Sequence, residues 1–176
     1  MKCRMFFAGS GGQGTLLIGQ MISKAAMEEG NETTYLPSYG PEMRGGTANC
    51  TVIVSDAAIA CPLINECDML VAMNKPSMEK FESMVVPGGY MFYNASVIDV
   101  APSRNDIQLI PVDCVAEAAE LGSEKAANIV MLGAIIAKMG IVNVQTVEHM
   151  LEKTFSGTKA KYLDMNMKAV HLHDEK

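Results

Sequence analysis

The sequence predicts an α/β protein, with a mainly parallel β-sheet sandwiched by helices and a helical C-terminal third. Three observations lead to this prediction. Short apolar and β-branched runs alternate with helical patterns along the first two thirds of the chain. A glycine-rich turn joins the first of these runs to the first helical pattern. From about residue 115 onward the apolar residues keep helical spacing, so this part should pack on the sheet or reach a partner.

The individual elements follow from the same patterns. Strands are expected at residues 3–8, 33–36, 49–55, 69–73, 90–94 and 107–112. Helices are expected at residues 15–29, from 76 to about 81, from about 115, at 129–139, after 143, and at 159–170. Pro37 should end the second strand, because proline cannot donate to a strand ladder, and Gly30 and Gly140 should end helices. No repeat or linker divides the chain, so we predict one domain covering residues 1–176.

Composition narrows the class of protein. The chain is 49% hydrophobic and 19% charged, as globular proteins are. Its net charge is −6 and it has no basic run, which argues against binding to nucleic acid. No stretch approaches the roughly 20 apolar residues of a membrane-spanning helix, and the apolar run after Arg4 is too short for a signal peptide. We therefore expect a cytoplasmic protein without a membrane or nucleic-acid partner.

The cysteines and methionines are expected to pack in the core rather than to form disulfides or metal sites. None of the five cysteines forms a Cys-x-x-Cys pair, so we expect reduced thiols and neither a disulfide framework, a zinc site nor an iron–sulfur cluster. We predict no metal ligand and no catalytic residue in this chain. The fifteen methionines should mainly fill core positions, although we also expect a large apolar or methionine-rich surface on the isolated chain, which should be stable mainly in a complex.

The first candidate binding motif is the glycine loop at residues 9–14, GSGGQG, between the first strand and the first helix. Glycines allow a tight turn and close backbone approach, and a helix N-terminus attracts anions, so a phosphate site is one reading and a tight turn without a ligand is the other. A dinucleotide fold would end its second strand on an acidic residue, but residues 35–38 contain none, which disfavours such a cofactor. The candidate binding residues here are Gly9, Gly11, Gly12, Gln13 and Gly14.

The second candidate motif is SYGPEMRGG at residues 38–46. Tyr39 offers an aromatic face and a hydroxyl, and Arg44 offers a planar guanidinium suited to phosphate or carboxylate. Because the motif follows the second strand, it should lie over the same edge of the sheet as the glycine loop. Asn74 and Asn94 should fall on that edge too, either as site residues or as turn residues that end strands. The candidate binding residues in the motif are Tyr39, Gly40, Arg44, Gly45 and Gly46.

These two motifs together, GSGGQG and then SYGPEMRGGTANC at residues 38–50, resemble the gamma subunit of 2-oxoacid:ferredoxin oxidoreductases. The glycine loop alone is unspecific, whereas the pair in this order is specific. The resemblance extends through the helix around residues 128–133 and fits a Rossmann-like fold. The second motif is most similar to the 2-oxoglutarate branch and close to the branched-chain branch. It is less similar to the pyruvate and indolepyruvate enzymes.

The resemblance implies a reaction in which a 2-oxoacid is decarboxylated on thiamine diphosphate, electrons pass through iron–sulfur clusters to ferredoxin, and coenzyme A receives the acyl group. It places thiamine diphosphate, magnesium and the clusters on alpha, beta and ferredoxin-like delta partner subunits. For this chain it implies no cofactor of its own, with both motifs helping to bind coenzyme A. Two alternatives stay open: a pure assembly subunit of a branched-chain or pyruvate oxidoreductase, and an independent dinucleotide-dependent reductase.

Overall fold

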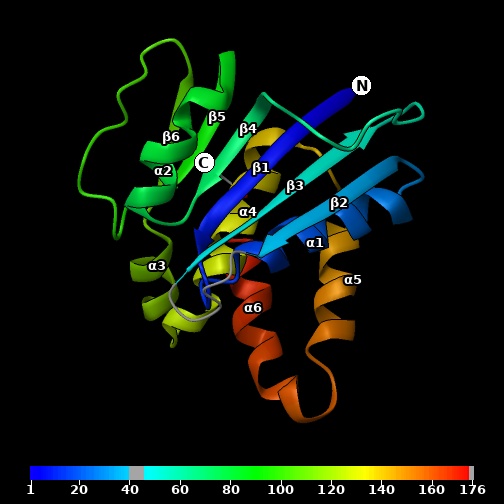
Figure 1. Cartoon of the computed structure of the whole chain (residues 1–176). Coiled ribbons are helices and arrows are strands. Elements are labelled where there is room, and N and C mark those ends of the chain that lie inside the picture. Colours follow the sequence, from blue (N-terminus) through cyan, green and yellow to red (C-terminus); the bar gives the residue numbers. More distant parts are fainter. Residues whose placement is uncertain (40–45, 175–176) are drawn as a thin grey trace.

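The computed structural model describes residues 1–39 and 46–174, and their six strands form a single mixed sheet in the order β2-β3-β1-β4-β5-β6 (Figure 1). The strands are β1 (Lys2–Ser10), β2 (Glu32–Tyr39), β3 (Thr47–Ser55), β4 (Cys67–Ala72), β5 (Val85–Asn94) and β6 (Gln108–Val112). β1, β4, β5 and β6 run parallel to one another, whereas β3 runs antiparallel to both β1 and β2. The predicted α/β fold is confirmed.

The β2–β3 pair is the part of the sheet that is not parallel. Residues 40–46 alone separate the two strands, and a crossover to a parallel strand needs about a dozen residues or more, so β3 turns back as the second arm of a hairpin. Pro37 lies within β2, opposite Cys50, and does not end the strand as predicted. β2 is the edge of the sheet, where a residue without an N–H is tolerated.

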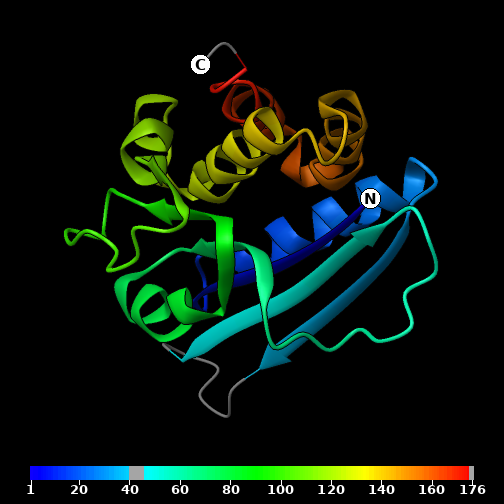
Figure 2. The same cartoon turned by 90° about the horizontal axis from the view of Figure 1, so that it is seen from above.

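The helices cover the two faces of the sheet unequally. Those in the described ranges are α1 (Thr15–Glu28), α2 (Lys75–Phe81), α3 (Cys114–Glu120), α4 (Ala127–Met139), α5 (Val144–Thr154) and α6 (Leu163–Val170), with 3-10 turns η1 (Glu82–Met84), η2 (Glu124–Ala126) and η3 (Gly157–Tyr162). α1, α4, α5 and α6 lie on one face and α2 on the other (Figure 2). Gly30 and Gly140 adopt the left-handed conformation just after α1 and α4, which confirms both predicted helix ends.

The core is rich in methionine, as the composition predicts. Met5, Met69, Met73, Met78 and Met91 are among the largest fully buried side chains. Among the described methionines, only Met1 and Met27 appear as exposed large apolar residues, so the expected methionine-rich surface is not found in this part of the chain. A flexible thioether fills irregular gaps between strands and helices, which accounts for its use in this core.

The cysteines are free thiols, as predicted. Burial raises the pKa of four of them, Cys3, Cys50, Cys67 and Cys114, to about 12. A thiol with such a pKa is protonated at neutral pH and behaves as a small apolar side chain. In residues 1–39 and 46–174, no helix combines the length and the apolar character that crossing a membrane would require.

Candidate functional site

The glycine loop forms a tight turn between β1 and α1. The Gln13 N–H donates to the Ser10 carbonyl at 3.2 Å, and Gly12 and Gly14 have φ values of +93° and +73°, which favour glycine. The N–H groups of residues 17 and 18 both donate to the Gly14 carbonyl. The preceding amides therefore stand at the open N-terminus of α1, where the helix attracts negative charge.

The Gln13 side chain fastens this loop to the end of β4. Its Oε1 accepts a hydrogen bond from the Ser10 N–H at 2.7 Å, and its Nε2 donates to the Met73 carbonyl at 3.0 Å. Asn74 Nδ2 donates to Ser10 Oγ at 2.7 Å and to Gln13 Oε1 at 3.2 Å. Both polar atoms of Gln13 are thus engaged inside the protein, where they hold the turn in shape.

The two asparagines at the strand ends complete the same network. Asn74 Oδ1 accepts from the Ser77 N–H at 2.9 Å and so caps α2. Asn94 is 1% exposed; its Nδ2 donates to the Met73 carbonyl at 3.4 Å and its Oδ1 accepts from the Ser96 N–H at 3.2 Å. Each asparagine therefore shapes a turn after its strand, and together with Gln13 they tie the ends of β1, β4 and β5.

The second motif leaves the sheet at the edge where the glycine loop lies. Tyr39 ends β2 opposite Ala48, which in turn pairs with Gly9 of β1. The Gly11 N–H donates to the Gly46 carbonyl at 3.1 Å and joins the two loops directly. The predicted common edge is confirmed for these described ends. Gly40, Arg44 and Gly45 lie outside the described residues, as does the side chain of Tyr39.

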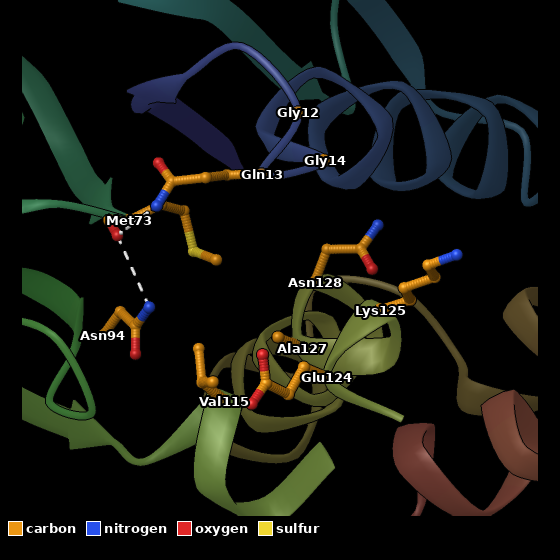
Figure 3. A pocket seen from close by; sticks show the side chains of 10 residues that line it. All are labelled: Gly12, Gln13, Gly14, Met73, Asn94, Val115, Glu124, Lys125, Ala127 and Asn128. Carbon is orange, nitrogen blue, oxygen red and sulfur yellow. Dashed lines mark hydrogen bonds between the residues drawn. The ribbon is translucent and has the colours of Figure 1, made fainter. Parts of the chain in front are cut away.

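A pocket of about 250 Å³ opens between the glycine loop and the start of α4 (Figure 3). It is lined by Gly12, Gln13, Gly14, Met73, Asn94, Val115, Glu124, Lys125, Ala127 and Asn128. Gly14 and Asn128 touch across it, since a Cβ on Gly14 would lie 2.5 Å from Asn128 Nδ2. Of the predicted site residues, Gly12, Gln13 and Gly14 line this pocket.

The far wall of the pocket comes from residues that sequence reasoning missed. Glu124 and Lys125 are exposed residues of η2, and Asn128 is a 9% exposed residue in the first turn of α4. They lie more than a hundred positions from the glycine loop, so no motif spacing connects them. A signal did exist: Asn128 interrupts the apolar run of residues 126–136, and a polar residue in an otherwise buried helix needs an explanation.

The side chains that line the pocket are suited to binding a ligand rather than to catalysing proton transfer. Glu124 and Lys125 are the titratable side chains that line the pocket in the described part of the chain. The remaining polar groups are carboxamides and backbone amides. Such groups donate and accept hydrogen bonds but do not transfer protons near neutral pH, so the pocket is suited to holding a polar ligand.

Residues 4–172 match the family described as pyruvate ferredoxin/flavodoxin oxidoreductase. The chain belongs to this family. The VorA subunit of the ketoisovalerate oxidoreductase of Methanothermobacter marburgensis is 38% identical over 169 residues, which cover 95% of this chain and 35% of that protein. The KorC subunit of the 2-oxoglutarate synthase of Methanocaldococcus jannaschii is 31% identical over 168 residues, 93% of this chain and 89% of that one.

Solved structures agree with the family assignment. The gamma subunit of a keto/oxoacid ferredoxin oxidoreductase from Geobacter sulfurreducens superposes with a TM-score of 0.83 at 28% identity, covering 98% of this chain and 96% of that chain. The 2-oxoglutarate:ferredoxin oxidoreductase from Magnetococcus marinus gives a TM-score of 0.89 at 24% identity, over 98% and 30% of the two chains, and shows a shared fold. This chain spans about a third of the length of the VorA relatives that it matches. The predicted resemblance is confirmed for the family, and the 2-oxoglutarate branch is not.

Proposed function

We propose that this chain is the gamma-type component of a 2-oxoacid:ferredoxin oxidoreductase. In that reaction a 2-oxoacid and coenzyme A give an acyl-CoA and CO2, and the two electrons released reduce ferredoxin. The observation that carries the proposal is the junction of the two motifs at one sheet edge, through the Gly11–Gly46 hydrogen bond, in a chain whose residues 4–172 match the family. The junction brings the glycine loop, the second motif and the pocket to one place.

The relatives support a unit that works beside catalytic partners. The same stretch corresponds to most of a separate KorC subunit, but to about a third of a VorA chain. A module that occurs both alone and within a longer chain can fold by itself and serve a shared complex. Thiamine diphosphate, magnesium and iron–sulfur clusters are then carried by alpha, beta and ferredoxin-like partners, and this chain contributes to coenzyme A binding.

The 2-oxoacid itself is the finer part of the proposal. The second motif favours 2-oxoglutarate, whereas the identity to VorA, 38%, exceeds the 31% to KorC. 2-Oxoglutarate carries a second carboxylate, whereas 2-oxoisovalerate carries a branched apolar chain. Activity measured with both substrates therefore distinguishes the two branches. We propose a panel of 2-oxoglutarate, 2-oxoisovalerate and pyruvate, each tested with and without coenzyme A.

The experiment is reconstitution of the complex. The chain is produced with its alpha, beta and ferredoxin-like partners, and viologen reduction is followed for each 2-oxoacid. We expect coenzyme A-dependent reduction by the complex with one preferred 2-oxoacid, and none by the isolated chain. Reduction by the isolated chain, or a complete complex that oxidises no 2-oxoacid, would refute the proposal.

Variants of Arg44 test whether this residue binds coenzyme A or only supports assembly of the complex. Arg44→Lys keeps the charge but loses the planar fork of the guanidinium, and Arg44→Ala loses both. If Arg44 serves coenzyme A, the change to alanine should weaken apparent coenzyme A affinity about tenfold to a hundredfold, while decarboxylation on thiamine diphosphate continues. If it serves assembly, the complex should loosen and both half-reactions should fall together.

The topology disfavours the alternative of an independent dinucleotide-dependent reductase. In a dinucleotide fold the strand bearing the acidic ribose ligand lies beside β1. Here β3 lies between β1 and β2, and the C-terminal end of β2, residues 36–39, contains no acidic residue. Titration of the chain with NADH, followed by its fluorescence, should show no saturable binding.

A further inference from the structure

Asn128 differs from the other buried asparagines. Asn94 donates to the Met73 carbonyl, and Asn166 donates to the Tyr162 carbonyl at 2.8 Å. Asn128 is 9% exposed and lines the pocket, yet its carboxamide has no hydrogen-bond partner within residues 1–39 and 46–174. Buried polar groups are nearly always hydrogen-bonded, so the Asn128 carboxamide has donors and an acceptor available to a group that enters the pocket.

The surroundings of Asn128 favour negative charge. The N-terminus of α1 opens into the pocket at Gly12 and Gly14, and the first turn of α4 forms the opposite side. Both helix ends carry partial positive charge. Lys125 adds a full positive charge beside Asn128 and is held by η2, where its N–H donates to Ser123 Oγ at 3.3 Å.

We propose that the pocket between the glycine loop and α4 is a phosphate-binding site in which Asn128 donates hydrogen bonds to the phosphoryl oxygens and Lys125 neutralises their charge. The backbone amides at the start of α1 complete the site, as they do for phosphates in other glycine loops. Glu124 lines the pocket beside Val115, and Asn128 lies on the side of Gly14 (Figure 3). Repulsion from Glu124 therefore places the phosphate at the Gly14 end.

The size of the pocket limits what it holds. Its volume of about 250 Å³ is smaller than the roughly 300–1,000 Å³ of sites that enclose a whole drug-sized ligand. It therefore takes a phosphate or pyrophosphate group, with the rest of the ligand outside. Assigning this group to coenzyme A rests on the proposed function, whereas phosphate binding itself stands on the pocket alone.

The experiment is a pyrophosphate titration of the full chain by ¹H–¹⁵N NMR at constant ionic strength. We expect saturable shifts of the Asn128 side-chain amide and of the Gly12 and Gly14 backbone amides. Asn128→Asp keeps the shape but replaces the two donors with a charge, and should weaken binding at least about tenfold. Asn143→Asp changes the net charge equally at the exposed start of α5, and should leave the affinity unchanged within about twofold.

Two further ligands identify the source of the phosphate. ADP carries a pyrophosphate link and adenosine 3′,5′-bisphosphate carries the 3′-phosphate found in coenzyme A; tighter binding of either one supports the site and names the group. Shifts of the wild-type chain that bypass Asn128 and Gly14 would overturn the inference, even if Asn128→Asp does not fold. So would loss of assembly in Asn128→Asp without any phosphate binding, since the occupant would then be a partner's carboxylate. These outcomes do not depend on whether the complex oxidises a 2-oxoacid.

Discussion

The two walls of the pocket use polar side chains in opposite ways. On the loop wall, the carboxamides of Gln13 and Asn94 form hydrogen bonds with Asn74 and with backbone groups at the ends of three strands. On the helix wall, Lys125 and Asn128 face the pocket without such bonds in the described part of the chain. The loop wall is a rigid frame and the helix wall is where a ligand finds unused donors. Glycine motifs mark where a site lies, but not which side chains bind in it.

The physical reason lies in what each wall must satisfy. Parallel strands end together and leave backbone N–H and C=O groups at the sheet edge, which neighbouring side chains complete. The Met73 carbonyl, for example, accepts from both Gln13 and Asn94. The start of α4 does not need the Asn128 side chain as a hydrogen-bond partner for its backbone, because the backbone of η2 leads directly into α4. Its carboxamide is therefore available to a ligand.

The largest expected effect is a loss of stability on substitution at Gly14, where the loop wall contacts the helix wall at Asn128. Gly14→Ala adds a Cβ that would lie 2.5 Å from Asn128 Nδ2 at a φ of +73°, so backbone strain and overpacking should together cost about 2–5 kcal/mol of the free energy of unfolding. Gly12→Ala has a similar φ of +93° but no atom within 4 Å, and should cost about 1–2 kcal/mol. Urea unfolding measures both. Equal losses would mean that the walls do not meet at Gly14.

The next effect compares one carboxamide from each wall. Gln13→Ala removes the partner of the Ser10 N–H and one of the two donors to the Met73 carbonyl, and should cost about 1–3 kcal/mol. Asn128→Ala removes no hydrogen bond within the described chain, and alanine favours the helix, so stability should stay within about 0.5 kcal/mol or rise slightly. Thermal unfolding of the two variants is the measurement. A comparable loss of stability in both variants would contradict the distinction between the loop wall, which holds the structure, and the helix wall, which faces the ligand.

A smaller effect concerns the charges of the helix wall. Lys125→Gln should weaken pyrophosphate binding about two- to fivefold, and Glu124→Gln should strengthen it by a similar factor, because both side chains are exposed and screened by solvent. Raising the salt concentration should shrink both differences. Isothermal titration at two ionic strengths gives the answer, and changes of the same sign in the two variants would contradict the proposed position of the phosphate.

The smallest expected effect is a pH dependence confined to the helical layer. The pKa of His171, just after α6, is raised above its ordinary 6.5, first by its hydrogen bond with Asp174 and also by Glu148 of α5, against partial burial. The interactions of His171 with Asp174 and Glu148 therefore contribute stability that is fully present below about pH 6.5 and is lost as the pH rises through the higher folded-state pKa of His171. The side chain is 36% exposed, so the contribution should stay below about 1 kcal/mol.

Hydrogen exchange locates this pH effect. Opening free energies in α6 should fall slightly as the pH rises above about 6.5 and through the raised His171 pKa, and His171→Gln should remove that dependence. The glycine loop should show no matching change, because α6 packs on α4, where a Cβ added to Gly133 would lie 2.3 Å from the Val170 carbonyl oxygen. An equal response in the β1–α1 turn would show that α6 is coupled to the loop wall.

Much of the architecture follows from the sequence alone. The β1–loop–α1 unit, the helix ends at Gly30 and Gly140, and the common edge of the two motifs were all predictable, because strand, helix and turn preferences depend on neighbouring residues. The buried methionines and thiols were predictable for a similar reason, since an apolar residue in a periodic segment faces the core.

Tertiary structure decided the rest. The antiparallel direction of β3 and the place of Pro37 inside an edge strand depend on which strands become neighbours. The engagement of Gln13 within the loop and the free carboxamide of Asn128 depend on contacts with Met73 and Gly14, far away in the sequence. A local pattern specifies which face of an element is apolar, but a hydrogen-bond partner or an empty space beside a polar group exists only once distant elements have packed together.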